Sequence, residues 1–156
     1  MTDPFAAVST ERVERDETVK VRTDRCLVQS HPGYKIYPLG ELEENPHYDL
    51  QKLKAVSREP GVAARDGWYP LAANTGVVFE APREYAGFPR FRARCRAPVT
   101  LYFSFDEFLR PDGSVDNFRA ETLGASVWHL APGEYDLEGF EPVAFKCARI
   151  LAVGGE

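Results

Sequence analysis

Apolar and polar residues alternate along residues 88–105, FPRFRARCRAPVTLYFSF. One set of positions holds four arginines and the other holds small or aromatic apolar residues: Arg90, Arg92, Arg94 and Arg96 against Phe91, Ala93, Cys95 and Ala97. The alternation breaks only at Pro98 and resumes with Val99, Leu101, Phe103 and Phe105 on the apolar face. A period of two residues is typical of a strand with one buried face. The segment therefore predicts two half-buried strands separated by Pro98.

Short apolar runs bounded by turn residues predict further strands in the rest of the chain. The chain has twelve glycines and twelve prolines, and their even spread leaves little room for long helices. The expected strands cover residues 18–21, 25–30, 33–40, 76–81, 125–130, 133–140 and 143–153. About nine short strands at such spacing are typical of a β-sandwich or a barrel. We predict an all-β fold, an antiparallel, jelly-roll-like β-sandwich with at most one short helix.

The segment 44–61, ENPHYDLQKLKAVSREPG, is the one candidate for that helix. Its apolar residues have a partial one-face helical spacing that ends at a proline–glycine pair: Tyr48, Leu50, Leu53 and Val56, then Pro60 and Gly61. The same segment is also compatible with a long loop. Residues 1–17 are charged and aperiodic, so we expect a loose lead-in there and a single β-sandwich domain over residues 18–156.

The composition bounds the partners of this domain. A hydrophobic content of 44% over 156 residues is enough for a buried core. The net charge of −5 gives no electrostatic basis for binding nucleic acid or an anionic membrane. No apolar run approaches the roughly 20 residues of a membrane span. The N-terminus lacks a signal-peptide pattern, which together with unpaired cysteines favours a cytoplasmic location.

Metal and cofactor motifs are missing from the sequence. Cys26, Cys95 and Cys147 are odd in number and far apart, which excludes a disulfide framework and a CxxC motif. The three histidines, His31, His47 and His129, lack the spacing of zinc ligands. No GxGxxG, P-loop or GxSxG sequence occurs. We therefore expect no metal and no cofactor, and we interpret Cys95 and Cys147 as core residues.

The segment 103–119, FSFDEFLRPDGSVDNFR, gathers acidic residues around a turn. Asp112 precedes Gly113 and is best explained as a turn residue, flanked by strands over 99–105 and 114–119. Adjacent Asp106 and Glu107 would point to opposite sides of a strand, which defeats the opposed carboxylates of a glycosidase. We expect Glu107, Asp116 and Arg119 to form a structural network across a hairpin instead.

Residues 66–154 resemble the β-sandwich domain that precedes the catalytic barrel in bacterial α-L-rhamnosidase-like glycoside hydrolases. The resemblance is carried by FDE at 105–107, the G-VD--R pattern from Gly113 to Arg119, and L-PG-Y-LE-FEP from Leu130 to Pro142. The run DGWYPLAANTGVVFEA at 66–81 resembles the preceding Trp-containing strand and the first sandwich strand. The chain departs from the pattern at Val143, where an aromatic residue commonly follows.

The resemblance implies a non-catalytic domain that packs on an (α/α) barrel of the same polypeptide and contacts a polysaccharide. The family's general acid and base belong to that barrel and have no counterpart in this sequence, so no catalytic residue is expected. Two other hypotheses remain open: a stand-alone carbohydrate-binding module, and a structural interaction domain without a ligand.

Four aromatic residues are candidates for stacking on a sugar: Trp68, Tyr69, Tyr102 and Trp128. For Trp68 and Trp128 we favour core positions over sugar stacking, whereas Tyr102 lies on the opposite face from Phe103 and is expected to be exposed. The four arginines of 90–96 either pair with the similarly spaced Glu134, Asp136 and Glu138 of a neighbouring strand or bind an acidic glycan or partner domain. We favour the internal pairing.

Overall fold

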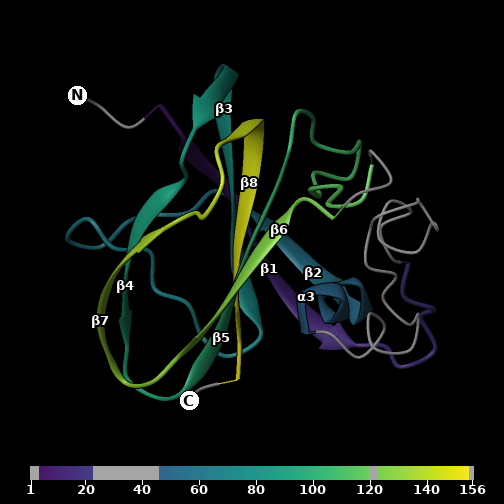
Figure 1. Cartoon of the computed structure of the whole chain (residues 1–156), viewed down its shortest axis with the longest axis horizontal. Coiled ribbons are helices and arrows are strands. Elements are labelled where there is room, and N and C mark those ends of the chain that lie inside the picture. The colour runs from purple at the N-terminus through teal and green to yellow at the C-terminus, as the bar shows by residue number, and fades with distance from the viewer. Residues whose placement is uncertain (1–3, 23–45, 120–122, 155–156) are drawn as a thin grey trace, which may run out of the picture.

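The computed structural model describes residues 4–22, 46–119 and 123–154. They form eight strands and one short helical segment (Figure 1): β1 (Ala6–Arg15), α3 (Pro46–Asp49) continued by a 3-10 turn (Leu50–Lys52), β2 (Leu53–Pro60), β3 (Thr75–Gly87), β4 (Arg90–Cys95), β5 (Val99–Asp106), β6 (Ala125–Leu130), β7 (Gly133–Glu138) and β8 (Val143–Val153). The prediction of an all-β fold with at most one short helix is confirmed. No helix in these ranges is long and apolar enough to cross a bilayer.

The strands form two antiparallel sheets. Six of them pair in the order β2-β1-β3-β8-β5-β6, and β4 pairs with β7 in a second, two-stranded sheet. The chain passes between the sheets through the β4–β5 and β6–β7 connections, which contain Pro98 and Pro132. Proline has no backbone N–H, so it suits a point where the chain leaves a hydrogen-bonded ladder. In Figure 1, β4 and β7 run side by side along the left of the larger sheet.

An aromatic core joins the two sheets. Phe91 of β4 stacks on Phe103 of β5 with ring centroids 6.1 Å apart, and meets Trp128 of β6 edge-to-face at 5.4 Å. Leu137 of β7 packs in the same layer with Leu101. The apolar residues of β4 therefore face inward and its arginines face outward, which confirms the half-buried strand predicted from the alternation.

The opposite face of the large sheet is covered by the 3-10 turn and by the segment between β5 and β6. Leu50, only 1% exposed, packs with Val13 of β1 and Leu151 of β8. Val115 packs in another buried cluster with Cys147. The large sheet is consequently buried on both faces, and the side chains on each face contribute to the core.

Two expectations for the N-terminal part are wrong. Residues 6–15 are not a loose lead-in, because β1 is an interior strand paired with both β2 and β3. Its many charged residues concealed it, since only Val13 is a large buried apolar side chain. Residues 18–21 are not a strand. The strands expected at 25–30 and 33–40 lie outside the described residues.

The helical expectation for 44–61 holds only for its start. Helical structure ends at Lys52, and Leu53–Pro60 form β2 at the edge of the large sheet. Tyr48, Leu50 and Leu53 are buried, but Val56 is 45% exposed, so the one-face spacing does not continue. Pairing of seven β2 residues with β1 outweighs a weak helical pattern.

The hairpin expected around 110–113 is reduced to its turn. Gly113 donates its N–H to the Arg110 carbonyl at 2.8 Å, but 114–119 form no strand and only Leu109 and Val115 bridge. The partners of β5 are β6 and β8. Both sides of β5 are therefore paired, so the 107–119 segment cannot add a strand beside it. The segment folds back over the sheet instead.

Candidate functional site

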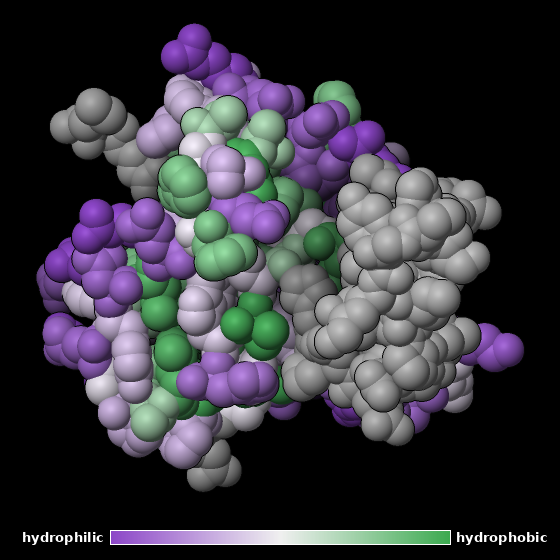
Figure 2. All heavy atoms as spheres, viewed as in Figure 1, coloured by the Kyte–Doolittle hydropathy of each residue, from purple (hydrophilic) through white to green (hydrophobic). Residues whose placement is uncertain are grey.

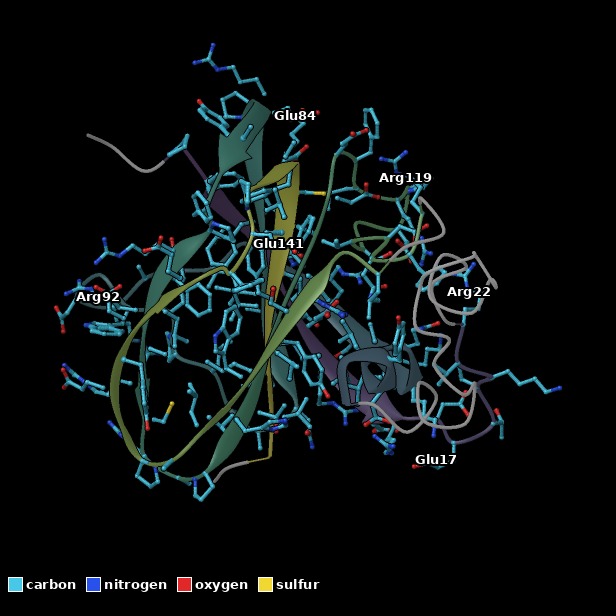
Figure 3. All side chains as sticks on the ribbon, in the orientation of Figure 1. Glu17, Arg22, Glu84, Arg92, Arg119 and Glu141 are labelled. Atoms are coloured by element: carbon cyan, nitrogen blue, oxygen red, sulfur yellow. The ribbon has the colours of Figure 1, made fainter. Side chains whose placement is uncertain are left out.

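Arg119 ties together the acids at the end of β5. Its Nε donates to both carboxylate oxygens of Asp106, at 2.8 and 3.0 Å, and its Nη2 donates to Glu107 Oε2 at 2.8 Å. The guanidinium also lies over the Phe108 ring, 5.4 Å from its centroid. Asp106 is 7% exposed, so its charge is answered inside the fold rather than by water. Arg119, labelled in Figure 3, thus pairs with two neighbouring carboxylates.

The other two acids of this segment are also engaged. Asp112 accepts hydrogen bonds from the Ser114 hydroxyl at 2.6 Å and from its amide at 2.9 Å, and these bonds lower the pKa of Asp112. Burial opposes ionisation of Asp116, but hydrogen bonds from Arg110 and the Phe118 amide outweigh it, so the pKa of Asp116 is also lowered. Asp116 thus pairs with Arg110, whereas Glu107 pairs with Arg119.

This arrangement suits a structural network better than acid–base catalysis. A glycosidase general acid needs a raised pKa, usually from burial or a neighbouring negative charge. Here the pKa values of Asp112 and Asp116 are lowered, and Arg119 is paired with both Asp106 and Glu107. In the described part of the chain, no group of three or more His, Cys, Asp or Glu side chains is arranged to hold a metal ion.

A buried ionic network that the sequence did not reveal lies beneath this segment. Glu11 of β1 accepts a hydrogen bond from Arg149 of β8 at 2.8 Å and another from Arg58 of β2 at 2.9 Å. Arg149 also donates to Ser104, and Arg58 donates to the Asp112 carbonyl at 2.5 Å. Arg149 is the one arginine in the apolar run VAFKCARILAV. An arginine at that position was the sequence feature that could have indicated a buried ion pair.

Cys147 completes the same face. Its thiol donates to the Asp106 carbonyl at 3.2 Å and is fully buried. Burial raises the pKa of Cys147 to about 11, so the thiol is not a nucleophile near neutral pH. Cys95 is half-buried on the inner side of β4, and burial also raises the pKa of that thiol. Cys26 lies outside the described residues.

Two of the four proposed sugar-stacking aromatics pack into the core of the fold. Tyr102 is 4% exposed and packs with the cluster around Leu50, so the expectation that it is exposed is wrong. Its face of β5 is covered by the 46–52 segment, which the alternation alone could not indicate. Trp128 packs against Phe91 inside the aromatic core.

Trp68 and Tyr69 lie on a surface turn beside β4. Asp66 and Gly67 both have positive φ, 51° and 78°, as a type I′ turn requires, and Arg65 and Trp68 exchange backbone hydrogen bonds at 2.8 and 2.9 Å. Tyr69 is 36% exposed and meets Phe79 edge-to-face. The turn is therefore anchored at its base, and the Tyr69 phenol packs on Phe79 of β3.

Two arginines of β4 lie over the Trp68 ring. The guanidinium carbons of Arg94 and Arg92 lie 4.8 and 5.4 Å from the centroid of its ring. Arg94 also pairs with Glu134 at 2.8 Å, and Arg90 donates its Nε to Asp136 at 2.9 Å. The prediction that β4 and the strand bearing these acids are neighbours is confirmed by the register of β4 and β7.

Three phenylalanines are exposed at one end of the fold. Phe88, Phe108 and Phe140 are 55%, 61% and 93% exposed. They follow β3, β5 and β7, and the register places these strand ends together, since Gly87 pairs with Val143 and Asp106 with Cys147. The Gly139 amide donates to the Pro89 carbonyl at 2.7 Å and joins the loops of Phe88 and Phe140.

Similarity to known proteins is confined to solved structures. No protein-family model matches the chain, and no curated protein matches it. The GH78 family rhamnosidase of Bacillus sp. GL1 superposes with a TM-score of 0.55 and 14% identity, covering 72% of this chain and 13% of that one. The chain shares a fold with part of a GH78 rhamnosidase.

A second solved structure also comes from a rhamnosidase. It is the rhamnosidase from Klebsiella oxytoca with rhamnose bound, with a TM-score of 0.44 and 17% identity over 97% of this chain and 26% of that chain. The chain therefore spans about an eighth and about a quarter of the lengths of these two proteins.

Proposed function

We propose that this chain is a non-catalytic β-sandwich domain of an α-L-rhamnosidase-like glycoside hydrolase and that it packs against a catalytic (α/α) barrel. The observation that carries this proposal is the exposed end formed by Phe88, Phe108 and Phe140. Large apolar side chains that stay exposed at one end of a domain are typical of a surface that another domain covers. The fold shared with a small part of a much longer rhamnosidase supports the same role.

The acids of the 103–119 segment support the non-catalytic part of the proposal. Asp106 and Glu107 share Arg119, so neither carboxylate is placed across a substrate from the other. An opposed pair roughly 5 to 9.5 Å apart is what glycoside hydrolysis requires. In this account the acids hold the 107–119 segment against the sheet, and the catalytic carboxylates belong to the partner domain.

The packing is tested in the full natural reading frame. We expect that frame to continue beyond codon 156 into a catalytic domain, and Phe140→Ser to speed limited proteolysis between the two domains. Val56→Ser is the matched control, because Val56 is 45% exposed but lies on β2, away from the phenylalanine end. A stop codon after Glu156, or equal cleavage of both variants, would contradict the packing role.

A second candidate function is carbohydrate binding at Trp68 and Tyr69. The specific observation in its favour is that a tight turn presents Tyr69, which is 36% exposed, next to Trp68, which is only partly buried. Such rings offer an apolar face and a polar edge, which match the C–H and hydroxyl surfaces of a sugar. Loss of polysaccharide retardation in affinity electrophoresis with Trp68→Ala supports this function, and unchanged retardation contradicts it.

A further inference from the structure

The arginine stripe on the outer face of β4 is only partly neutralised by the acids of β7. Asp136 lies directly opposite Arg92 in the register, yet its carboxylate is bound by Arg90 through two hydrogen bonds. Glu134 forms an ion pair with Arg94. Within the described ranges Arg92 and Arg96 have no ion pair with a carboxylate, and both are exposed. Figure 3 shows Arg92 projecting outward from the β4 edge.

Arg92 is held in place without being neutralised. Its guanidinium lies over the Trp68 ring, which the guanidinium of Arg94 also approaches. Stacking on an indole orients a guanidinium, and a ring contact of this kind leaves its N–H donors free to bind a planar anion.

We propose that Trp68 and Arg92, with the exposed Arg96 further along the same stripe, form a binding site for a uronic acid residue of an acidic polysaccharide. The inference rests on the sugar-binding function proposed above for Trp68 and adds the charge of the ligand. A uronate carries a carboxylate at the edge of a pyranose ring whose C–H face is apolar. The carboxylate matches the fork of Arg92, and the ring matches the partly exposed indole beside it.

The acids near the site define where the ligand lies. Glu134 and Asp136 would repel a carboxylate, but each is already paired with an arginine on the flank of the stripe. Asp66 at the tip of the turn is the further negative charge on this element, and Arg65 is beside it. The unpaired positive charge on this face is therefore at Arg92 and Arg96.

The test measures binding of two uronate oligomers, oligogalacturonate and oligomeric alginate, by titration calorimetry. Their methyl-esterified forms are the neutral controls, and dextran sulfate is the control for unspecific anion binding. We expect the carboxylate form of at least one oligomer to bind, the ester to bind at least about ten-fold more weakly, and Arg92→Gln to reduce affinity about ten-fold. Trp68→Ala is expected to abolish the remaining binding.

Arg83→Gln is the matched control variant. Arg83 is exposed, and its guanidinium carbon lies 5.2 Å from the centroid of the Tyr85 ring, but it belongs to β3 in the other sheet. The Arg83→Gln variant should bind the uronate oligomers with the same affinity as the wild type. Circular dichroism of each variant shows that the fold is intact, and Arg92→Gln keeps the test valid if Trp68→Ala unfolds.

The outcomes separate the inference from the function on which it rests. Equal binding of esterified and free oligomers that Trp68→Ala abolishes would keep sugar binding and overturn the uronate specificity. Failure of every sugar to bind would overturn both. Binding of dextran sulfate as tight as that of the uronates, unaffected by Trp68→Ala, would reduce the surface to an unspecific anion patch and overturn the proposal.

Discussion

Glu11 and Arg149 form a buried ion pair between residues 138 positions apart in the sequence, with Arg149 Nη1 2.8 Å from Glu11 Oε1. Their side chains are 1% and 9% exposed. Arg58 bonds the second oxygen of Glu11 and reaches the carbonyl of Asp112 on the acid-rich segment. The network therefore connects β1, β2 and β8 with the segment that covers them, so an interior carboxylate determines how this face of the fold closes.

Glu11→Gln should be strongly destabilising. The substitution leaves two arginines near the core without a counter-charge, and removing one partner of a buried ion pair costs about 3 to 5 kcal/mol. Urea unfolding measures the free-energy difference. The control is Glu14→Gln on the same strand, where an exposed pair with Arg12 is worth about 0 to 1 kcal/mol. Similar losses for both variants would show that the Glu11 network does not stabilise the fold.

Gly139→Ala should lower stability through a steric clash. A Cβ at Gly139 would lie 2.6 Å from Pro89 Cγ, in the contact that joins the loops of Phe88 and Phe140. Relieving this overlap requires a backbone shift, with an expected cost of about 1 to 3 kcal/mol. Gly87→Ala in the same region meets no atom within 4 Å and should change stability by about 0.5 kcal/mol or less. Thermal unfolding that ranks the two variants equally would contradict the close approach.

Asp136→Asn should remove a contribution to stability that depends on salt and on pH. The hydrogen bond from Arg90 lowers the pKa of Asp136, so the folded state is favoured above the unfolded pKa and loses this contribution as pH falls through the lower folded value. The variant should unfold at lower urea than the wild type at pH 7 and low salt. The difference should shrink in about 1 M NaCl and below about pH 3. A midpoint that stays unchanged at low salt would leave the pair without effect on stability.

Sequence patterns predicted the second half of the fold because its strands have one face toward a core. The arginine–apolar alternation of β4 correctly indicated which side is buried, and the ends of β6 and β8 match the expected 125–130 and 143–153. The acids of β7 were correctly expected beside the arginines, since opposite charges at a common period favour neighbouring strands. Local periodicity is sufficient to predict a strand where only one of its faces is buried.

The same reasoning failed where tertiary contacts decide. β1 is rich in charges, and burial of Glu11 became apparent only from its pairing with Arg149 and Arg58. Tyr102 lies on the face of β5 that the alternation predicted to be polar and exposed, yet the 46–52 segment covers it. The turn that presents Trp68 was readable as Asp-Gly, but its position beside Arg92 and Arg94 depends on a loop far from β4 in sequence.

The central claim is that the acid-rich segment is structural and that this chain catalyses no glycoside hydrolysis. The most direct measurement is the release of phenol from an aryl α-L-rhamnoside by the wild type, by Glu107→Gln and by Arg119→Gln. We predict rates equal to that of buffer for all three, with a lower unfolding midpoint for Arg119→Gln because Asp106 loses its buried counter-charge. Turnover by the wild type that disappears in Glu107→Gln would contradict the account.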